Sequence, residues 1–315
     1  MTSTRSQRRR PLLALFALLA VMGLTAAACG SDDSGGDDAA DVPDGPAIVI
    51  GAQDFPESVV LSELYAQGLA ESGYQTSVQD LGGYRDLLYG AFENGDVNFA
   101  LEYAGSMLNF LADPDAPAGN DVGENADQAA SLLEEQGIVV AEPSEAVNTN
   151  AFVMLRETAE DLGIETLSDL AENGADLRLG APSDCETNPF CIPGLEETYG
   201  LDMSGNLVAL DDGRIDALRG GEFDVAVAFS TDPPLIDDDL VVLEDDQGML
   251  PAENIVPVMA QALVDAYGQD LVDRIDEISA ALTTENVTEM NRAYVVDRED
   301  ASAIVAAFLS DNGLT

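Results

Sequence analysis

Residues 90–106 read GAFENGDVNFALEYAGS, and residues 216–232 read DALRGGEFDVAVAFSTD. Both stretches show the same order of features: the end of a helix, a turn of glycine and acidic residues, an apolar strand, and a polar or aromatic end. Ligands of open α/β sheets bind at the carboxyl ends of the strands. That rule indicates Glu102 and Tyr103 in the first stretch and residues 229–232 in the second. Two such stretches predict two similar α/β lobes with a ligand cleft between them.

The rest of the chain alternates in the same way between short apolar runs and stretches of helical periodicity. The run at 47–51 predicts a buried strand, and the residues from Pro56 to Gly73 predict a helix with Asp54 as its N-cap. Further strands are predicted at 76–78, 97–101, 151–155, 177–181, 223–229, 240–243 and 255–258, and further helices at 84–94, 195–199, 211–220 and, with polar joints, 262–309. This alternation predicts α/β layers with mostly parallel sheets.

The first 30 residues have the composition of an export signal. Four arginines lie among the first ten residues, an apolar run follows at 12–24, and small residues then lead to Cys29. The apolar run is shorter than the about 20 residues of a membrane span. A cysteine at this place resembles a bacterial lipobox, so we expect residues 1–28 to be a lipoprotein signal peptide and Cys29 to carry a lipid. Ordinary cleavage nearby, or an uncleaved anchor helix, is the alternative. Residues 29–46 are polar and acidic, which predicts a disordered tether.

The charge of the chain is extreme. It carries 60 acidic residues against 12 basic ones, a formal net charge of −48, and all of the basic residues are arginine. Such a charge repels nucleic acid and anionic lipid, so we expect neither as a partner. We interpret the charge as an adaptation to a salty habitat, in which salt screens the self-repulsion of the folded chain.

The chain contains no histidine and no lysine, which removes most enzyme classes. Without histidine there is no Ser-His-Asp triad and no zinc site of the HExxH kind. Without lysine there is no Schiff base and no P-loop. We therefore expect neither an enzyme nor a cofactor or metal. A hydrolase that uses two carboxylates stays open as an extracellular alternative, with Glu102 and Asp232 as its pair.

Cys185 and Cys191 lie six residues apart in a chain that we expect to be exported, where thiols are oxidised. We expect a disulfide between them, which stabilises the fold by about 2 kcal/mol in the loop-entropy account. A metal site with two thiolates is the alternative, but no histidine or third cysteine is available to complete it.

Seven stretches, in order along the chain, carry a family resemblance. They are GAQDFPES at 51–58, LGG at 81–83, GDVNFALEYAGS at 95–106, NTNAFVML at 148–155, CETNPFCIPGLEETYGL at 185–201, FSTDP at 229–233 and PAENIVPV at 251–258. Together they resemble the binding proteins of osmoprotectant ABC transporters, which take up glycine betaine, choline and related quaternary amines. The resemblance runs from about residue 47 to residue 314.

The resemblance implies an α/β fold of the type II periplasmic-binding-protein class, in which the chain crosses twice between two lobes. We place the crossings near Val147 and Glu253. The first lobe then comprises residues 47–147 together with 253–315, and the second lobe comprises residues 148–252.

The resemblance also implies a function. Proteins of this kind capture a small osmolyte by closing the cleft and deliver it to the permease subunits of an ABC importer. We expect a monomeric binding protein for glycine betaine, choline or a related quaternary amine, attached to the outer face of the cell membrane only by the lipid on Cys29. A binding protein for a non-quaternary polar solute is the alternative.

In this family, aromatic side chains enclose the quaternary ammonium through cation–π contacts, and polar groups of the second lobe hold a carboxylate where the ligand has one. By resemblance, Tyr103 keeps an aromatic wall, Phe229 replaces a more usual tyrosine, and Phe190 can restore a further wall. Phe55 and Asp232 are also candidates, although a helix start explains Phe55 equally well and a turn before Pro233 explains Asp232 better. The candidate ligand-binding residues are Tyr103, Phe229, Asn148, Asn150, Asn188, Phe190, Asp232, Glu253 and Phe55.

Besides Phe229, four of these positions depart from the family pattern. Asn148 and Asn150 occupy a stretch where other members place an acid and a tyrosine. Asn188 stands where many members carry an arginine, and Glu253 falls where some carry a tyrosine. These departures weaken glycine betaine in particular as the ligand, and they leave choline, another cation or a different polar solute open.

Overall fold

The structure is a computed structural model that describes residues 45–112, 118–210 and 213–315. The predicted signal peptide, the lipid attachment at Cys29 and almost all of the predicted tether lie outside the described residues. Within the described ranges, no helix is both long and apolar enough to cross a membrane.

The first of two sheets has the strand order β2-β1-β3-β10-β4. Its strands are β1 (Ile48–Ala52), β2 (Thr76–Asp80), β3 (Phe99–Tyr103), β4 (Ile138–Val140) and β10 (Ile255–Ala260). Strand β1 pairs in parallel with β2 and β3, and β10 lies antiparallel between β3 and β4. Strand β10 therefore runs against the other four strands, so the sheet is mixed rather than purely parallel.

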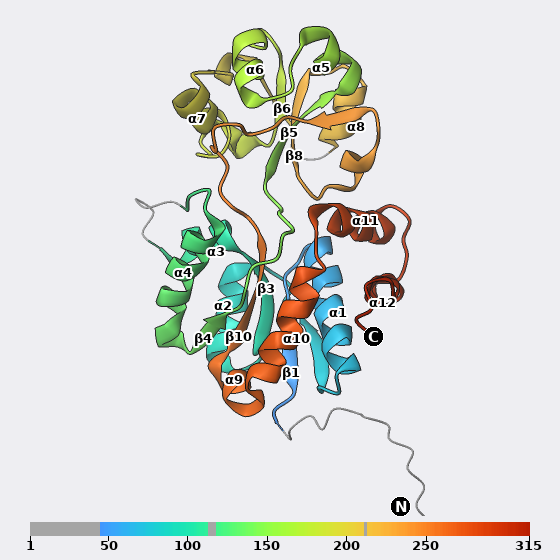
Figure 1. The fold of residues 1–315 in the computed structure, drawn as a ribbon. Coiled ribbons are helices and arrows are strands. Elements are labelled where there is room, and N and C mark those ends of the chain that lie inside the picture. Colours follow the sequence, from blue (N-terminus) through green and yellow to red (C-terminus); the bar gives the residue numbers. More distant parts are fainter. Residues whose placement is uncertain (1–44, 113–117, 211–212) are drawn as a thin grey trace, which may run out of the picture. The chain divides into compact units, whose positions relative to one another are not determined.

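Helices cover both faces of this first sheet (Figure 1). The side chains of β3 alternate between the faces: Phe99 and Leu101 belong to one hydrophobic core and Ala100 to another. The core with Phe99 packs against α1 (Pro56–Glu71), α9 (Gln261–Tyr267), α10 (Gln269–Ala280), α11 (Thr284–Val295) and α12 (Ala301–Asp311). The core with Ala100 packs against α2 (Arg85–Asn94), α3 (Ala104–Leu111) and α4 (Val122–Leu133), and η1 (Glu134–Gln136) follows α4.

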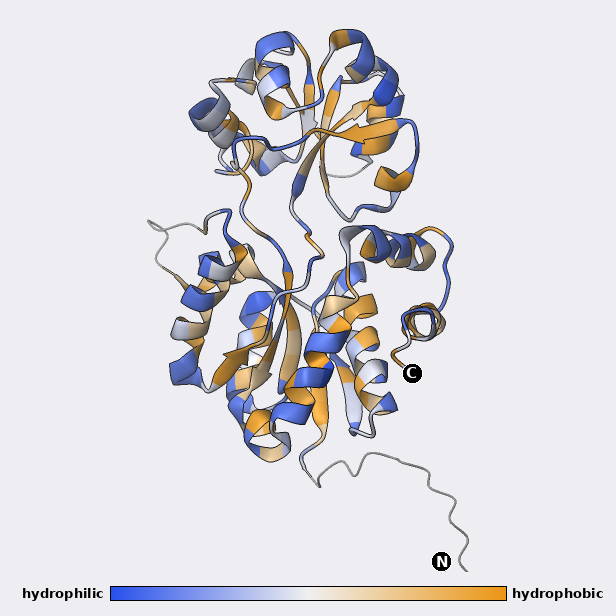
Figure 2. Ribbon diagram, viewed as in Figure 1, coloured by the Kyte–Doolittle hydropathy of each residue, from blue (hydrophilic) through white to orange (hydrophobic). Residues whose placement is uncertain are grey.

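The second sheet repeats the layout with the order β7-β6-β8-β5-β9. Its strands are β5 (Asn150–Leu155), β6 (Leu179–Ala181), β7 (Leu207–Ala209), β8 (Val225–Phe229) and β9 (Leu240–Val242). Strand β6 is parallel to β7 and β8, and β5 runs antiparallel to β8 and β9. The helices around it are α5 (Arg156–Leu162), α6 (Leu167–Asn173), α7 (Ile192–Gly194) and α8 (Arg214–Arg219), with short turns at η2 (Ser183–Glu186), η3 (Leu195–Tyr199), η4 (Ser204–Asn206) and η5 (Pro233–Ile236). Figure 2 shows that the strands of both sheets are mostly hydrophobic, as buried central strands require.

The chain passes from the first sheet to the second between β4 and β5, and returns between β9 and β10. The two connecting segments contact each other, because Val147 and Asn254 form an antiparallel bridge and the Asn148 N–H donates to the carbonyl oxygen of Glu253 at 3.0 Å. In both sheets, the strand that follows a crossing is the one that runs antiparallel to its neighbours.

Several predicted elements differ from the structure. Phe55, not Asp54, is the N-cap of α1, and it caps through its backbone position without a side-chain hydrogen bond. The predicted helix at 211–220 begins only at Arg214, and 195–199 is a single π-helical turn. No helix was predicted at α4, α5 or α6. For α6 a signal exists, since Thr166 and Asp169 form a capping box.

Candidate ligand-binding site

A cavity of about 860 Å³ lies where loops from both sheets meet. Its lining comes from the segments that directly follow β1, β2 and β3 in the first sheet and β8 in the second, together with Asn148 of the first crossing and two residues of α11. These segments leave the carboxyl ends of parallel strands, where ligands of α/β proteins bind. The topology therefore places this cavity where the sequence predicted a cleft.

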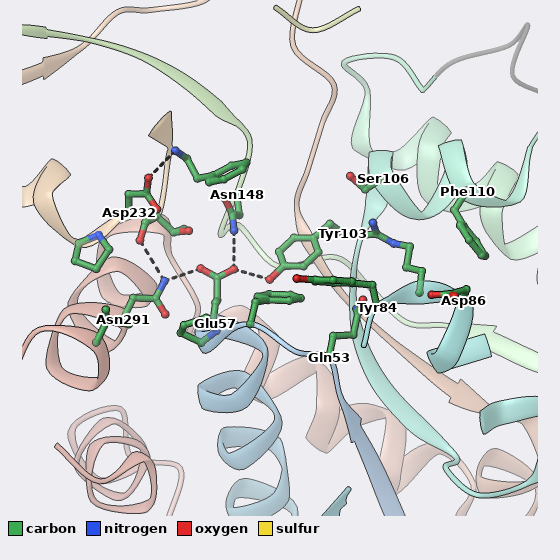
Figure 3. Close-up of a pocket in the computed structure, with 17 residues that line it drawn as sticks. Gln53, Glu57, Tyr84, Asp86, Tyr103, Ser106, Phe110, Asn148, Asp232 and Asn291 are labelled. Atoms are coloured by element: carbon green, nitrogen blue, oxygen red, sulfur yellow. Dashed lines mark hydrogen bonds between the residues drawn. The ribbon is translucent and has the colours of Figure 1, made fainter. Parts of the chain in front are cut away.

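The buried carboxylate of Glu57 is held at the centre of a group of hydrogen-bond donors (Figure 3). Its Oε1 accepts from the Tyr103 hydroxyl at 2.5 Å and from Asn148 Nδ2 at 2.9 Å, and its Oε2 accepts from Asn291 Nδ2 at 2.6 Å. Glu57 is only 5% exposed. It lies in the first turn of α1, directly after Pro56, where the positive end of the helix dipole favours an acid.

Five aromatic side chains line the same cavity as this carboxylate. Phe55 and Tyr103 lie side by side, with their ring centroids 6.2 Å apart, and Tyr84, Phe110 and Phe229 complete the aromatic part of the lining. Burial and the neighbouring Glu57 carboxylate raise the pKa of Tyr103 well above its ordinary value, so its hydroxyl stays protonated and donates to Glu57. Tyr84 and Phe229 are 61% and 47% exposed, so both have surface available to a ligand.

An arginine lines the cavity at the start of α2. The Arg85 Nε donates to both carboxylate oxygens of Glu102, at 2.9 and 3.2 Å. Glu102 lies behind the cavity lining and is fully buried. Burial raises the pKa of Glu102, and the Arg85 guanidinium opposes that shift. Glu253 is also close enough to Arg85 for its charge to stabilise the guanidinium.

The second sheet contributes the loop after β8. The Asp232 carboxylate accepts from the Phe229 N–H at 3.0 Å, which closes a tight turn at the edge of the cavity. Burial raises the pKa of Asp232, and the charge of Glu57 adds to that shift. The side-chain amide of Asn291 donates both to Glu57 and, at 3.1 Å, to the carbonyl oxygen of Thr231. Asn291 thus joins α11 and α1 to the loop of the second sheet.

The structure brings five of the nine predicted ligand-binding residues into the cavity lining: Phe55, Tyr103, Asn148, Phe229 and Asp232. The other four do not line it. Asn150 donates through its side chain to the carbonyl oxygen of Phe190 at 3.1 Å, and the Asn188 side chain accepts from the Phe190 N–H at 2.9 Å. Glu253 accepts from the backbone N–H and the hydroxyl of Ser106, at 2.9 and 2.7 Å.

Three of the four residues outside the lining lie in or next to the loop that holds both cysteines. A disulfide joins Cys185 to Cys191, with their Cα atoms 5.3 Å apart, and both side chains are buried in the core of the second sheet. The side chains of Asn150 and Asn188 are hydrogen-bonded to the backbone of Phe190. A ligand contact by any of these three residues stays a prediction.

Glu57, which accepts three hydrogen bonds in the cavity, was not among the predicted ligand-binding residues. The rule on strand ends could have pointed to it, because the loop after β1 leads within five residues to Glu57 in the first turn of α1. Tyr84, Arg85 and Phe110 were also missed. Asn291 had no signal in the sequence, since α11 lies far along the chain from every other part of the lining.

Over residues 46–311, the chain matches the family model described as the substrate binding domain of the ABC-type glycine betaine transport system. It is 28% identical over 293 residues to the glycine-betaine-binding protein of Pseudomonas aeruginosa, covering 88% of this chain and 91% of that protein. It is 23% identical over 279 residues to the glycine betaine-binding protein YehZ of Escherichia coli, covering 85% of this chain and 91% of that protein.

The fold has close counterparts among solved structures. The crystal structure of a glycine betaine/carnitine/choline ABC transporter protein superimposes with a TM-score of 0.77, at 24% identity, over 85% of this chain and 99% of that chain. The prediction of a two-lobed type II periplasmic-binding-protein fold is confirmed. With the family match over most of its length, the chain belongs to the family of substrate-binding domains of ABC-type glycine betaine transport systems.

Proposed function

We propose that this chain captures a small quaternary amine, such as glycine betaine or choline, in the cavity and delivers it to the permease of an ABC importer. The observation that carries the proposal is that five aromatic side chains line the same cavity as the buried Glu57 carboxylate. Aromatic faces attract a quaternary ammonium, and a nearby carboxylate balances its charge. Glycine betaine in the names of two relatives supports the same class of ligand.

We also propose that the ligand is enclosed by closure of two lobes, with the limits 47–147 plus 253–315 and 148–252. Each sheet draws all its strands from one of these sets, which supports the division. The cavity takes lining residues from both sets, so a rotation at the paired crossing segments would bring the loop after β8 onto the ligand.

Family members are extracytoplasmic binding proteins. We propose that this one is held at the outer face of the cell membrane by a lipid on Cys29, as the lipobox-like sequence at 25–30 indicates. Incorporation of a labelled fatty acid that is lost in Cys29→Ser would support this anchor. Equal labelling of both forms would contradict it.

A carboxylate-dependent hydrolase is not favoured. The two acids of that alternative do not meet in the cavity, because Asp232 lines it while Glu102 lies behind the lining in its ion pair with Arg85. The family is one of transport binding proteins.

The proposal is tested by calorimetric titration of the purified protein in molar salt with choline, glycine betaine, carnitine, ectoine and proline. We expect one-to-one binding of at least one quaternary amine. Phe229→Ala should weaken it by about 5- to 30-fold, the equivalent of a cation–π contact of about 1–2 kcal/mol. Ile236→Ala is the matched control, an exposed apolar side chain near the end of the same loop but outside the cavity lining. Silence of the folded protein toward every quaternary amine would refute the function.

A further inference from the structure

The buried carboxylate of Glu57 has no cationic side chain paired with it among the described residues. It accepts three hydrogen bonds, all from neutral groups, and none of the ion pairs among the described residues includes it. A buried carboxylate without a cation is costly. A cation bound in the cavity would remove that cost, whereas a neutral ligand would not.

The hydrogen bonds to Glu57 also fix the surrounding amides. A carboxylate only accepts, so Asn148 and Asn291 must both turn their amide nitrogens toward it. Asn291 is fixed twice, since the carbonyl oxygen of Thr231 is likewise an acceptor. The amide oxygens of Asn148 and Asn291 are consequently buried without a donor. Because its nitrogen already donates to Glu57 and to the carbonyl oxygen of Thr231, Asn291 offers no free donor to a ligand carboxylate, and the nitrogen of Asn148 is likewise engaged by Glu57.

The lining also carries more negative than positive charge, which likewise disfavours a ligand carboxylate. Glu57, Asp86 and Asp232 line the cavity, and Arg85 is the cation among its lining residues. The Nε of Arg85 already holds both oxygens of Glu102. Glu253 also interacts with Arg85 through its charge. A ligand carboxylate at this guanidinium would be a third negative group around one positive group.

A second arginine, Arg214, lies close to the cavity and donates hydrogen bonds to backbone carbonyl oxygens. Arg214 lines a smaller adjacent cavity that shares Phe229 and Asp232 with the first. Its Nε donates to the carbonyl oxygen of Val227 at 2.5 Å, and its Nη1 donates to that of Leu210 at 3.3 Å. Its charge acts on Asp232, where it opposes the effect of burial on that carboxyl group.

We propose that the cavity selects a quaternary ammonium of net positive charge that ends in a hydroxyl group, such as choline, over a zwitterion with the same headgroup, and that Glu57 is the counter-charge. This inference rests on the proposed function, because it takes the aromatic side chains as the site of the ammonium. The aromatic faces contact the trimethylammonium group in the same way in both kinds of ligand. The discrimination therefore comes from the other end of the ligand, where a hydroxyl group donates and a carboxylate is repelled.

The test compares three ligands of nearly equal shape by calorimetry at one ionic strength. Choline and glycine betaine differ in their hydroxyl and carboxylate ends, and 3,3-dimethyl-1-butanol replaces the charged nitrogen of choline with carbon. We expect choline to bind at least about tenfold more tightly than either of the others, which corresponds to roughly 1.4 kcal/mol. Glycine betaine binding as tightly as choline, or more tightly, would overturn the inference and leave the proposed function standing. If the folded protein bound neither of these amines nor carnitine, the proposed function itself would be overturned.

The variant Glu57→Gln tests the role of the charge. We expect it to weaken choline by at least about tenfold and to leave 3,3-dimethyl-1-butanol within about twofold, since only the charged ligand interacts with a counter-charge. The neutral ligand also reports whether the aromatic site survives the substitution. Glu71→Gln removes an exposed acid from the same helix, outside the cavity lining, and should change neither affinity. Equal losses for the charged and the neutral ligand in Glu57→Gln would refute Glu57 as the counter-charge.

Discussion

At the scale of the residue, the site depends on which polar atoms are already engaged. Asn148 was predicted as a ligand contact, and it does line the cavity, but its amide nitrogen is engaged by Glu57. Tyr103 combines two roles, since its ring lines the cavity and its hydroxyl donates to the same carboxylate. The negative charge that lies beside the aromatic side chains therefore comes from Glu57 at the start of α1. The crossing segment, where other family members place an acid, carries the neutral Asn148.

Asp232 should make ligand binding depend on pH. Burial raises the pKa of its carboxyl group above that of an exposed aspartate; the hydrogen bond from the Phe229 N–H and the charge of Arg214 oppose the shift, and Glu57 adds to it. As the pH falls from neutral through this raised pKa, Asp232 gains a proton and the cavity loses a negative charge. The affinity for a cation should therefore fall in mildly acidic solution, above the pH range in which an exposed aspartate titrates.

The measurement is choline affinity between pH 7.5 and pH 4.5 for the wild type and for Asp232→Asn. The asparagine keeps an oxygen that can accept from the Phe229 N–H. We expect the variant to bind choline about fivefold more weakly at pH 7.5, through loss of one nearby charge, and to show a flatter pH profile. Because the native state holds the Asp232 proton more tightly than the unfolded chain does, the substitution should not lower the melting temperature at neutral pH. An unchanged pH profile in the variant would assign the titration to another group.

At the scale of the element, strand periodicity explains both what the sequence predicted and what it missed. Strands β3 and β8 were predicted from apolar runs that end in polar residues, and the cavity lies at their carboxyl ends. The same runs did not indicate which of Glu102 and Tyr103 would line the cavity. Successive side chains of a strand point to opposite faces, so Tyr103 belongs to the core that packs on α1, while Glu102 lies on the other side with Arg85.

The remaining differences come from contacts between distant segments. Asn291 reaches the cavity only because α11 packs beside η5, and this packing is a tertiary contact that no local pattern encodes. A salt bridge between Arg292 and Asp237, at 2.7 Å, strengthens the same contact. Asn188 and Phe190 lie outside the lining for the opposite reason, because their local loop is closed by the disulfide and by its own hydrogen bonds.

At the scale of the whole molecule, net charge opposes the fold. The chain has 60 acidic residues and 12 basic ones, so few of the acids can find a cation. Most ion pairs of the described ranges are exposed to solvent, as in Arg178 with Asp224 and Arg219 with Asp239. Exposed pairs contribute about 0–1 kcal/mol each and are screened by salt. Repulsion among the unpaired acids is screened by the same ions, and it involves many more residues.

We therefore expect salt to stabilise this protein. Raising NaCl from 0.1 to 2 M shortens the Debye length from about 10 Å to roughly 2 Å, which removes more repulsion than attraction in a chain of this charge. The melting temperature, followed by circular dichroism, should rise by about 5 °C or more, which corresponds to roughly 1–2 kcal/mol for a chain of this size. Sucrose at equal osmolality is the control, because it favours burial by exclusion from the surface without screening charge. A rise that is equal in sucrose and in salt would mean that exclusion, not screening, stabilises the fold. A melting temperature that falls with salt would mean that the arginine pairs outweigh the repulsion, and the excess of acid would then need another explanation than stability in salt.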